Sequence, residues 1–360
     1  MNDIGLQLKE KRCEKKLSMR DVAAITGIDP ALISKMEGGD RLPTEKQIAT
    51  LAELYELNMR KIRVYWLAEK LFRRLKGEAG AMEALNIVHN RIEKLYKERV
   101  VNTPGLTQEI KEKIAKVDFT RQLLGKKPPL EKEHSRQREE EFLIEFIHES
   151  NRLADSQLNL QETTAIIKKG HVASGKSLHE HLAVVNHQDA MFLLRELIEE
   201  GKDFSVSTIL KLHRILYRGI DRENAGKYRE ITPPVKDHLY QLPAHQKVAK
   251  LLQKYVNFYH KEEGKLHPVL LAAMLHQRFL KIQPFADGNG RVARLIMNYI
   301  LLRHGYAIVT IKGDSFSRQI YENTLEKAQV DHKSDGFFHL ITDLTVDALR
   351  NHLDWRPALY

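Results

Sequence analysis

The sequence has 360 residues, of which 42% are hydrophobic and 29% are charged, and its formal net charge is +10. This length predicts two or three structural units, and the composition excludes a chain that stays disordered. Cys13 is the only cysteine, which excludes an intramolecular disulfide and a thiolate metal cluster, and we expect it to pack as a small hydrophobe.

The sequence has neither a secretory signal nor an uninterrupted run of 18 apolar residues. We therefore expect a cytoplasmic protein that makes no membrane contact. The positive charge and a pI near 9.4 favour a polyanionic partner.

The first part of the chain has apolar residues at helical spacing and predicts a small helical bundle. Ser18 is placed to cap a helix from Met19 to about Thr26, and Gly27 supplies a turn. Asp29 then caps a second helix with Pro30 at its first position, and Gly38 and Gly39 end it. Two capped helices around a turn predict a helix-turn-helix. The apolar positions are Ile4, Leu8, Val22, Ile25, Ile28, Ile33, Met36, Ile48, Leu51, Leu54 and Leu57.

The run LSMRDVAAITGIDPALISKMEGGDRLP resembles the Xre/Cro-like repressor family, and the resemblance covers residues 4–67. It implies that the second helix enters the major groove of double-stranded operator DNA, which could include the promoter of its own gene. A homodimer with half-sites roughly 34 Å apart is expected. The alternative is a helical bundle used for protein contacts. The resemblance places Ile28, Ile33 and Met36 in the core, Asp29, Ala31, Ser34 and Lys35 at base edges, and Arg20 and Arg41 at phosphates.

Residues 61–99 keep the helical period, interrupted near Gly77 and Gly80, and their apolar stripe predicts either core or a dimer seam. Residues 125–141 combine a Pro-Pro pair with a charge run, which predicts a linker. We expect a DNA-binding domain at 1–67, a helical connector with a charged linker at 68–140, and a second domain at 141–360. The rest is helical except for Arg229–Pro243, where three prolines and β-prone pieces predict a two-stranded flap. The predicted class is all-α.

The run KIQPFADGNGRVARLIMNYILL predicts a phosphate-binding loop between two apolar helices. Gly288 and Gly290 allow backbone N–H groups to approach an anion, and the following helix N-terminus favours negative charge. Asp287 could hold Mg²⁺, and Asn289 offers its amide to a phosphoryl oxygen. The alternative is a glycine turn of purely steric origin. Arg291 and Arg294 lie three residues apart on the first turns of the helix, where both can reach a polyphosphate.

This motif resembles the Fic family signature HPF-x-[DE]-GNGR-x-x-R, and the resemblance extends over about residues 141–345, with support from HLAVVNHQDA, AGKYRE, HPVLLAAMLHQRF and SRQIYENTLEKA. It implies a helical core that binds ATP with Mg²⁺ and transfers AMP to a protein hydroxyl lying along the flap. Carried over residue by residue, it assigns Asp287 to the metal and Gly288, Asn289 and Gly290 to the α- and β-phosphates. It assigns Arg291 and Arg294 to the outer phosphates, and Asn298 and Tyr321 to the adenine side.

Two departures from the family pattern matter. Gln283 stands where the family has the histidine that acts as general base, and an amide cannot accept the proton of an attacking hydroxyl near pH 7. Losing a general base lowers the rate by about 10²–10⁴. His276 is expected to pack within the fold rather than replace it. In ESNRLADSQLN, which resembles the family's autoinhibitory element, Ser150 is kept, whereas Ala154 followed by Asp155 replaces the glutamate that would pair with Arg294.

These observations predict a DNA-binding transcription regulator whose Fic-type domain binds ATP and Mg²⁺ without transferring AMP. One alternative is an active adenylyltransferase that modifies a protein target or itself. The other is a toxin-antitoxin component.

Overall fold

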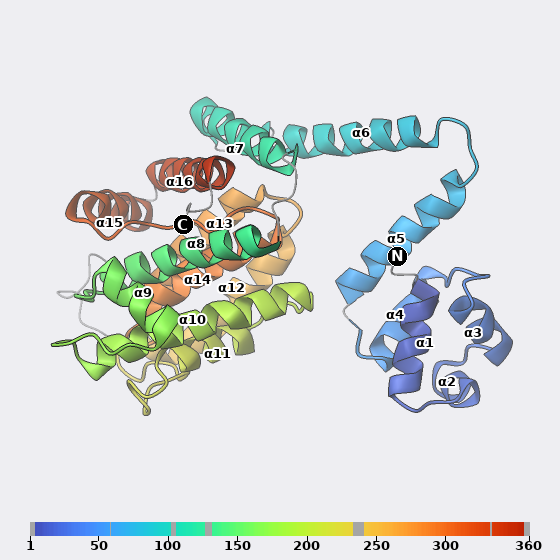
Figure 1. Cartoon of the computed structure of the whole chain (residues 1–360), viewed down its shortest axis with the longest axis horizontal. Coiled ribbons are helices and arrows are strands. Elements are labelled where there is room, and N and C mark those ends of the chain that lie inside the picture. Colours follow the sequence, from blue (N-terminus) through green and yellow to red (C-terminus); the bar gives the residue numbers. More distant parts are fainter. Residues whose placement is uncertain are drawn as a thin grey trace. The chain divides into compact units, whose positions relative to one another are not determined.

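The computed structural model describes residues 4–57, 59–101, 106–126, 132–232, 241–331 and 333–355. It divides into two compact units, Met1–Glu93 with Glu199–Asp203, and Lys94–Ile198 with Phe204–Tyr360, and each is described by itself (Figure 1). The described residues form sixteen α-helices and no strand. The predicted all-α class is confirmed.

The N-terminal unit begins with four short helices followed by a longer one, and their apolar faces form one core. The helices are α1 (Ile4–Glu14), α2 (Met19–Thr26), α3 (Pro30–Glu37), α4 (Glu45–Leu54) and α5 (Met59–Leu75), followed by α6 (Ala81–Val101). The buried core residues are Ile4, Leu8, Val22, Ile28, Ile33, Met36, Ile48, Leu51, Ala52, Tyr55, Ile62 and Trp66.

The predicted caps of α2 and α3 are confirmed. Ser18 and Asp21 form a reciprocal capping box at the start of α2, and Gly27 ends the helix in the left-handed conformation. The Asp29 carboxylate accepts hydrogen bonds from the backbone N–H groups of Ala31 and Leu32 at the start of α3. These caps satisfy backbone groups that would otherwise lack partners, so they fix where each helix begins.

Close packing of α1 on α3 fixes the orientation of the second helix of the helix-turn-helix. A Cβ atom on Gly5 would lie 2.5 Å from the carbonyl oxygen of Met36, so only glycine allows this approach. The guanidinium of Arg12 makes a two-point ion pair with the Glu37 carboxylate, with N–O distances of 2.7 and 2.8 Å. Trp66 of α5 joins the same core and donates to the carbonyl of Pro43 at 2.7 Å.

One apolar position of this unit lies outside the core, and the expectation for Cys13 is wrong. Ile25 is 61% exposed, because it lies on the face of α2 that is turned away from the core. Cys13 is exposed near the end of α1 and does not pack as a small hydrophobe.

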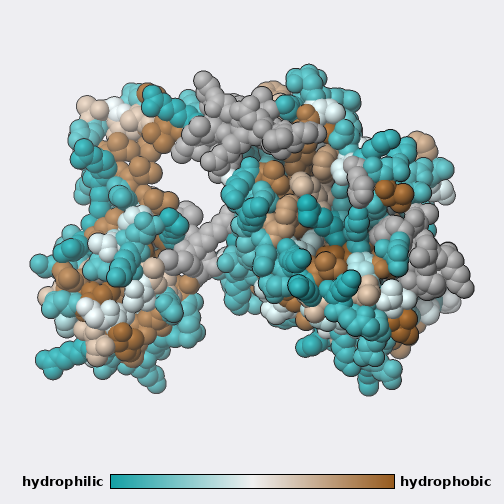
Figure 2. Space-filling view, turned by 180° about the vertical axis from the view of Figure 1, so that it is seen from behind, coloured by the Kyte–Doolittle hydropathy of each residue, from teal (hydrophilic) through white to brown (hydrophobic). Residues whose placement is uncertain are grey.

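Ile62 and Trp66 of α5 belong to the core of the N-terminal unit, whereas most of the other described apolar residues of α5 and α6 are exposed within this part of the chain. Figure 2 shows hydrophobic surface gathered on this unit. The exposed residues are Leu67, Leu71, Phe72, Met82, Leu85, Ile87 and Val88.

The C-terminal unit is built around α13 (Pro268–Ile282) and α14 (Asn289–Arg303), which pack against each other (Figure 1). Both are buried on nearly all sides, which is the pattern of central helices. α12 and α16 pack on α13, and α8 and α11 pack on α14. The surrounding helices are α7 (Gln108–Lys126), α8 (Lys132–Arg152), α9 (Leu160–Lys169), α10 (Leu178–Glu199), α11 (Val206–Leu216), α12 (Val248–Glu262), α15 (Ser315–Val330) and α16 (Asp335–Asp354).

Helix α7 packs along α16 and contributes Ile110, Ile114 and Val117 to the core of this unit. His267, which caps α13, lies 3.1 Å from a carboxylate oxygen of Asp118 on α7. The domain limits given above remain a prediction, but α7 packs as a member of the C-terminal core.

The centre of the predicted flap, residues 233–240, lies outside the described residues. Its described ends, 229–232 and 241–243, are not strands. In the described part of the chain, no helix is both long enough and apolar enough to span a bilayer.

Candidate nucleotide-binding site

The predicted phosphate loop joins the end of α13 to the start of α14. Asn289 fixes its shape, because the side-chain amide accepts from the Phe285 N–H at 3.0 Å and donates to the Phe285 carbonyl at 2.9 Å. The oxygen and one N–H of the Asn289 amide are therefore engaged within the loop. Gly288 has a φ of 76°, and a Cβ atom there would lie 2.3 Å from the Tyr217 ring, so this position requires glycine.

Asp287 lies at the mouth of the loop with its carboxylate largely exposed. Its carboxylate accepts a hydrogen bond from the Tyr217 hydroxyl at 2.6 Å and another from the Gly288 N–H at 2.6 Å. Its partial burial would raise the pKa of Asp287, but these two hydrogen bonds together with the positive charge of Arg291 outweigh that effect and lower the pKa. The group is therefore a carboxylate at neutral pH, as a cation ligand must be.

Arg291 is buried behind Asp287. One guanidinium nitrogen donates to the Tyr217 hydroxyl at 2.6 Å, and the guanidinium lies over the Tyr217 ring at 4.9 Å. Its Nε is buried with no hydrogen-bond partner in the described residues. A buried donor without an acceptor is costly, and an anion in the loop would provide one.

His213, on the last turn of α11, holds the backbone of the phosphate loop at Asp287. Its Nδ1 accepts from the Gly226 N–H at 2.9 Å, so the proton lies on Nε2, which donates to the Asp287 carbonyl at 3.1 Å. The ring stacks on Phe285 with a centroid distance of 3.7 Å. Burial lowers the pKa of His213 to about 4. The imidazole is neutral at pH 7, and each of its nitrogens makes a hydrogen bond to a backbone group, one in Gly226 and one in Asp287.

Arg294 is held by the end of α8. Its Nε donates to the Ser150 hydroxyl and one Nη donates to the Ser150 carbonyl, both at 2.8 Å. The other Nη lies 3.2 Å from the position that a Cβ atom on Gly290 would take. Ser150 therefore orients the guanidinium so that its remaining nitrogen faces the loop.

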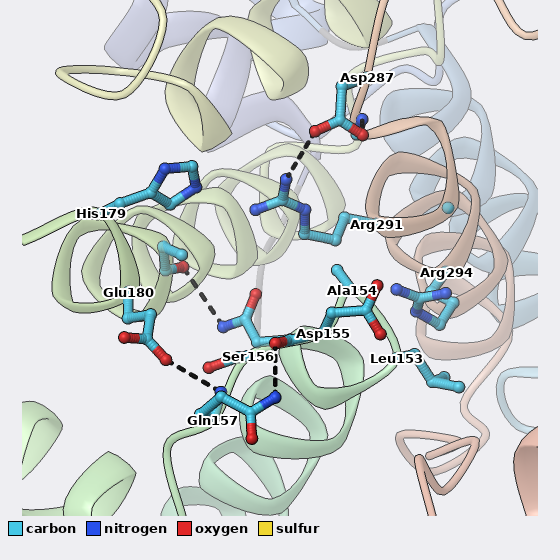
Figure 3. Close-up of a pocket in the computed structure, with 14 residues that line it drawn as sticks. Leu153, Ala154, Asp155, Ser156, Gln157, His179, Glu180, Asp287, Arg291 and Arg294 are labelled. Carbon is cyan, nitrogen blue, oxygen red and sulfur yellow. Dashed lines mark hydrogen bonds and ion pairs between the residues drawn. The ribbon is translucent and has the colours of Figure 1, made fainter. Parts of the chain in front are cut away.

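A cavity of about 610 Å³ lies beside both arginines (Figure 3). It extends from the phosphate loop to the turn after α8 and the first turn of α10. Asp155 does not pair with Arg294, because it binds Arg318 at 2.8 Å. The methyl group of Ala154 leaves this space open. The lining residues are Asn151, Leu153, Ala154, Asp155, Ser156, Gln157, His179, Glu180, Ala183, Asp287, Gly288, Gly290, Arg291 and Arg294.

Gln283 ends α13 in the left-handed conformation, with φ of 43°. Arg229 holds it there, since its Nε donates to the Gln283 carbonyl at 2.8 Å. The other Arg229 nitrogens donate to the carbonyls of Ile231 at 3.0 Å and Pro243 at 2.6 Å. Arg229 thus joins the two ends of segment 229–243 to the residue that precedes the phosphate loop. The Gln283 side chain is half-buried and does not line the cavity.

The histidines near the loop differ in their access to the cavity. His276 is fully buried, its Nε2 lies 2.8 Å from the Tyr321 hydroxyl, and burial lowers its pKa to about 3, as expected for a packed residue. His187 is also fully buried, and burial together with Arg291 and Arg294 lowers its pKa. His179 is exposed and lines the cavity from α10, facing Arg291 in Figure 3.

The two residues expected on the adenine side are both buried. Asn298 is fully buried, and its amide donates to the Val309 carbonyl at 3.0 Å and accepts from the Val309 N–H at 2.8 Å. Tyr321 is buried between His276 and Phe337. Neither residue lines the cavity, and their assignment to the adenine side remains a prediction.

The residues of the loop fit a polyphosphate with a divalent cation. The glycine backbone, the orphaned Arg291 Nε and the oriented Arg294 suit phosphate oxygens, and the Asp287 carboxylate suits Mg²⁺. No cluster of three or more metal-ligating His, Cys, Asp or Glu side chains occurs in the described ranges. A cation here would take one carboxylate from the protein and its remaining ligands from phosphate and water, as Mg²⁺ commonly does.

In the N-terminal unit, all the residues predicted to contact DNA are exposed: Arg20, Asp29, Ala31, Ser34, Lys35 and Arg41. Ile28, Ile33 and Met36 are buried as expected. The Asp29 carboxylate is used by the cap of α3, so it positions that helix.

The sequence reasoning missed His213 and Tyr217 and gave Arg229 no role. His213 and Tyr217 are four residues apart, a spacing that places two side chains on one helix face and could have marked them as a pair. Arg229 belongs to AGKYRE, which was used only as support for the resemblance.

The central helix pair and the glycine-rich loop define a Fic-type fold. Residues 203–301 match the model of the Fic/DOC family, and residues 8–62 match a helix-turn-helix model. Both resemblances are confirmed, and the chain carries a Fic/DOC-family domain and an N-terminal helix-turn-helix domain.

Proteins named adenylyltransferase Fic are similar to this chain in sequence. The protein adenylyltransferase Fic of Nematostella vectensis is 32% identical over 178 residues, which cover 48% of this chain and 40% of the relative. The protein of the same name in Drosophila melanogaster is 31% identical over 177 residues, which cover 49% of this chain and 36% of the relative. The match thus spans less than half the length of these relatives.

Solved structures share the fold. A Fic domain containing signaling protein from Bacteroides thetaiotaomicron has a TM-score of 0.61 at 23% identity, covering 67% of this chain and 95% of that one. Fic-1 from C. elegans has a TM-score of 0.61 at 19% identity, covering 98% of both chains.

Proposed function

We propose that this protein is a DNA-binding transcription regulator whose Fic-type domain binds ATP with Mg²⁺ and does not transfer AMP efficiently. The observation that carries the proposal is Gln283, an amide placed directly before an otherwise complete phosphate loop. The helix-turn-helix, with its exposed recognition residues, supports operator binding by a homodimer.

The chemistry of AMP transfer explains why Gln283 matters. The attacking hydroxyl oxygen forms a bond to the α-phosphorus, the bond to the bridging oxygen breaks, and pyrophosphate leaves. The hydroxyl proton must pass to a base, and an amide has no usable basicity near pH 7. The residues of this chain would bind and orient the nucleotide: Asp287 for the cation, the glycine backbone for phosphates, and Arg291 and Arg294 for the outer charges.

A labelled-ATP transfer assay on the full chain tests the loss of catalysis. We expect the Gln283→His variant to label itself or a lysate at least about 10²-fold faster than the wild-type chain. Equal rates would refute the proposal. Calorimetric titration with ATP and Mg²⁺ tests binding separately, and Arg294→Ala should weaken it. Because Arg294 is buried and donates twice to Ser150, the variant should also be less stable, so circular dichroism at the titration temperature checks that it is folded.

A second candidate function, active protein adenylylation, is favoured by one specific observation, the exposed imidazole of His179 in the cavity. A neutral imidazole can accept a proton near pH 7, unlike an amide. If the wild-type chain transfers AMP and His179→Ala abolishes transfer while ATP binding persists, His179 is the base and this second function holds.

Regulation by nucleotide is tested with DNA. We expect the affinity of the full chain for the DNA upstream of its own gene to change when ATP and Mg²⁺ are added, and the change to be lost in Arg294→Ala. An identical shift in both proteins would show that ATP acts elsewhere.

A further inference from the structure

Tyr217 also lines a second hollow, of about 450 Å³, formed by the end of α11 and the turn that follows it. We call this feature the basic hollow. Its lining residues are Arg214, Tyr217, Arg218, Gly219, Arg222, Ala225 and Lys227.

The charges that line the basic hollow are all positive. Arg218 is paired with Asp189. Arg214, Arg222 and Lys227 are exposed, and none has an ion pair or side-chain hydrogen bond with another described residue. Several unpaired cations around one concave surface repel one another and create a positive potential that attracts anions.

The carboxylates of the same turn form no ion pair with Arg214, Arg222 or Lys227 in the described residues. The carboxylate of Asp221, in the same turn, accepts from the backbone N–H groups of Glu223 and Asn224 and from the Asn224 side chain. Glu223 is exposed but does not line the hollow. The side chains that line the hollow itself therefore carry positive charge and no negative charge.

The turn that carries these cations is fixed. The N–H groups of Ile220 and Asp221 both donate to the Tyr217 carbonyl, at 3.0 and 3.1 Å. The Gly226 N–H donates to His213, and a Cβ atom on Gly226 would lie 2.9 Å from the Cβ of Arg214. Glycine at this position thus lets Arg214 pack closely against the turn.

We propose that the basic hollow is a second anion site that binds a phosphate-rich ligand, separate from the loop of Asp287 to Arg294. Guanidinium groups present planar donor pairs that match phosphate oxygens. The lining has no asparagine, glutamine, serine or threonine that could read a base or a sugar, so the ligand is recognised through its phosphates. These could belong to free polyphosphate or to the phosphate tail of a nucleotide.

Tyr217 connects this site with the phosphate loop. Its hydroxyl donates to Asp287 and accepts from Arg291, while the residue also lines the basic hollow. An anion bound in the basic hollow would therefore lie beside Tyr217, the side chain that orients Asp287 and Arg291. The inference goes beyond nucleotide binding in the loop and does not require it.

The test uses calorimetric titration of the full chain with inorganic tripolyphosphate in an Arg294→Ala background, which weakens the loop site. We expect addition of Arg214→Ala and Arg222→Ala to remove one equivalent of bound tripolyphosphate, or to lower that site's affinity at least about tenfold. The matched control, Lys250→Ala with Lys254→Ala on α12, removes two exposed positive charges away from the hollow and should change the affinity less than about twofold. If the arginine double variant and the lysine double variant lost the same affinity for tripolyphosphate, the proposed site would be refuted.

Further arms identify the ligand. ATP binding with an affinity similar to that of tripolyphosphate supports the hollow as a site for nucleotide tails, whereas much weaker ATP binding supports it as a site for free polyphosphate. A hexaglutamate peptide that binds as tightly as tripolyphosphate would overturn the assignment to phosphate. Lys227→Ala alone repeats the test with a smaller change, so the result does not depend on the double variant folding. If the loop binds no nucleotide at all, the hollow should still bind tripolyphosphate in the otherwise wild-type chain.

Discussion

The two units carry their functional side chains in opposite ways. In the helix-turn-helix unit, the side chains expected at DNA are exposed on α2, α3 and the following turn, while the core lies behind them. In the Fic unit, Arg291 and Arg294 are buried, and each is bonded to a residue of another helix. Substituting a side chain expected at DNA should therefore change DNA binding with little effect on the stability of the first unit. Substituting Arg291 or Arg294 should change both nucleotide binding and the stability of the second unit. The following predictions test this difference, beginning with the largest effect.

Arg229→Ala should destabilise the C-terminal unit by about 4 kcal/mol, because it leaves the carbonyls of Gln283, Ile231 and Pro243 without their charged donor. Urea unfolding followed by circular dichroism measures this. In a Trp355→Phe background, the fluorescence of Trp66 follows the N-terminal unit, and its transition should not move. A shift of that transition by the same amount would contradict independent stabilities.

Lowering the pH should destabilise the C-terminal unit through His213. Its folded pKa is about 4 and its unfolded pKa is near 6.5, so the unfolded chain binds the proton more readily between these values. The stabilisation is complete above about pH 6.5 and is lost as the pH falls toward 4. The loss amounts to about 3 kcal/mol.

Urea unfolding at several pH values, with wild type and His213→Gln, checks this prediction. The variant should be less stable at pH 7 and lose less of its stability on acidification. Residues 1–57 contain no histidine, and His89 of the same unit is exposed rather than buried, so the N-terminal unit should show a smaller change over the same range. An unchanged slope in His213→Gln would exclude His213 as the cause.

Gly288→Ala should cost about 2–3 kcal/mol, because the new methyl group combines a φ of 76° with overlap of the Tyr217 ring. Gly305→Ala is the matched control, since Gly305 has the same φ and no atom within 4 Å of its Cβ position. It should cost only about 1 kcal/mol. Similar values from thermal unfolding of the two variants would show that Tyr217 moves aside readily.

Ser34→Ala and Lys35→Ala should have the smallest effect on stability, within about 0.5 kcal/mol, because both side chains are exposed. Operator binding should nevertheless weaken by about 1–3 kcal/mol for a lost base contact. Lys46→Ala, exposed on α4, serves as the control in a gel-shift titration. Unaltered operator affinity in all three variants would place the recognition surface elsewhere.

Local features were predictable from sequence, whereas contacts between distant segments were not. The capping box at Ser18 and the glycine loop before α14 depend on residues a few positions apart, so their spacing is visible in the chain. The contact of Tyr217 with Asp287 joins residues 70 positions apart, and no local pattern reveals it. The two-point contact of Ser150 with Arg294 spans 144 positions.

The burial of individual side chains could not be predicted from sequence for a similar reason. Asn298 has the polarity of a ligand contact, but its amide is satisfied by the backbone of Val309, and only the packing of the following loop reveals that partner. Cys13 and Ile25 have the hydrophobicity of core residues, but both are exposed. A short helix buries only one face, and a difference of one position along the helix decides whether a side chain lies on the buried or the exposed face.

Because Arg229 donates to the carbonyls of Ile231, Pro243 and Gln283, one side chain fastens both described ends of its segment to the end of α13. A displacement at either of these ends therefore reaches the residue that precedes the phosphate loop through a single guanidinium.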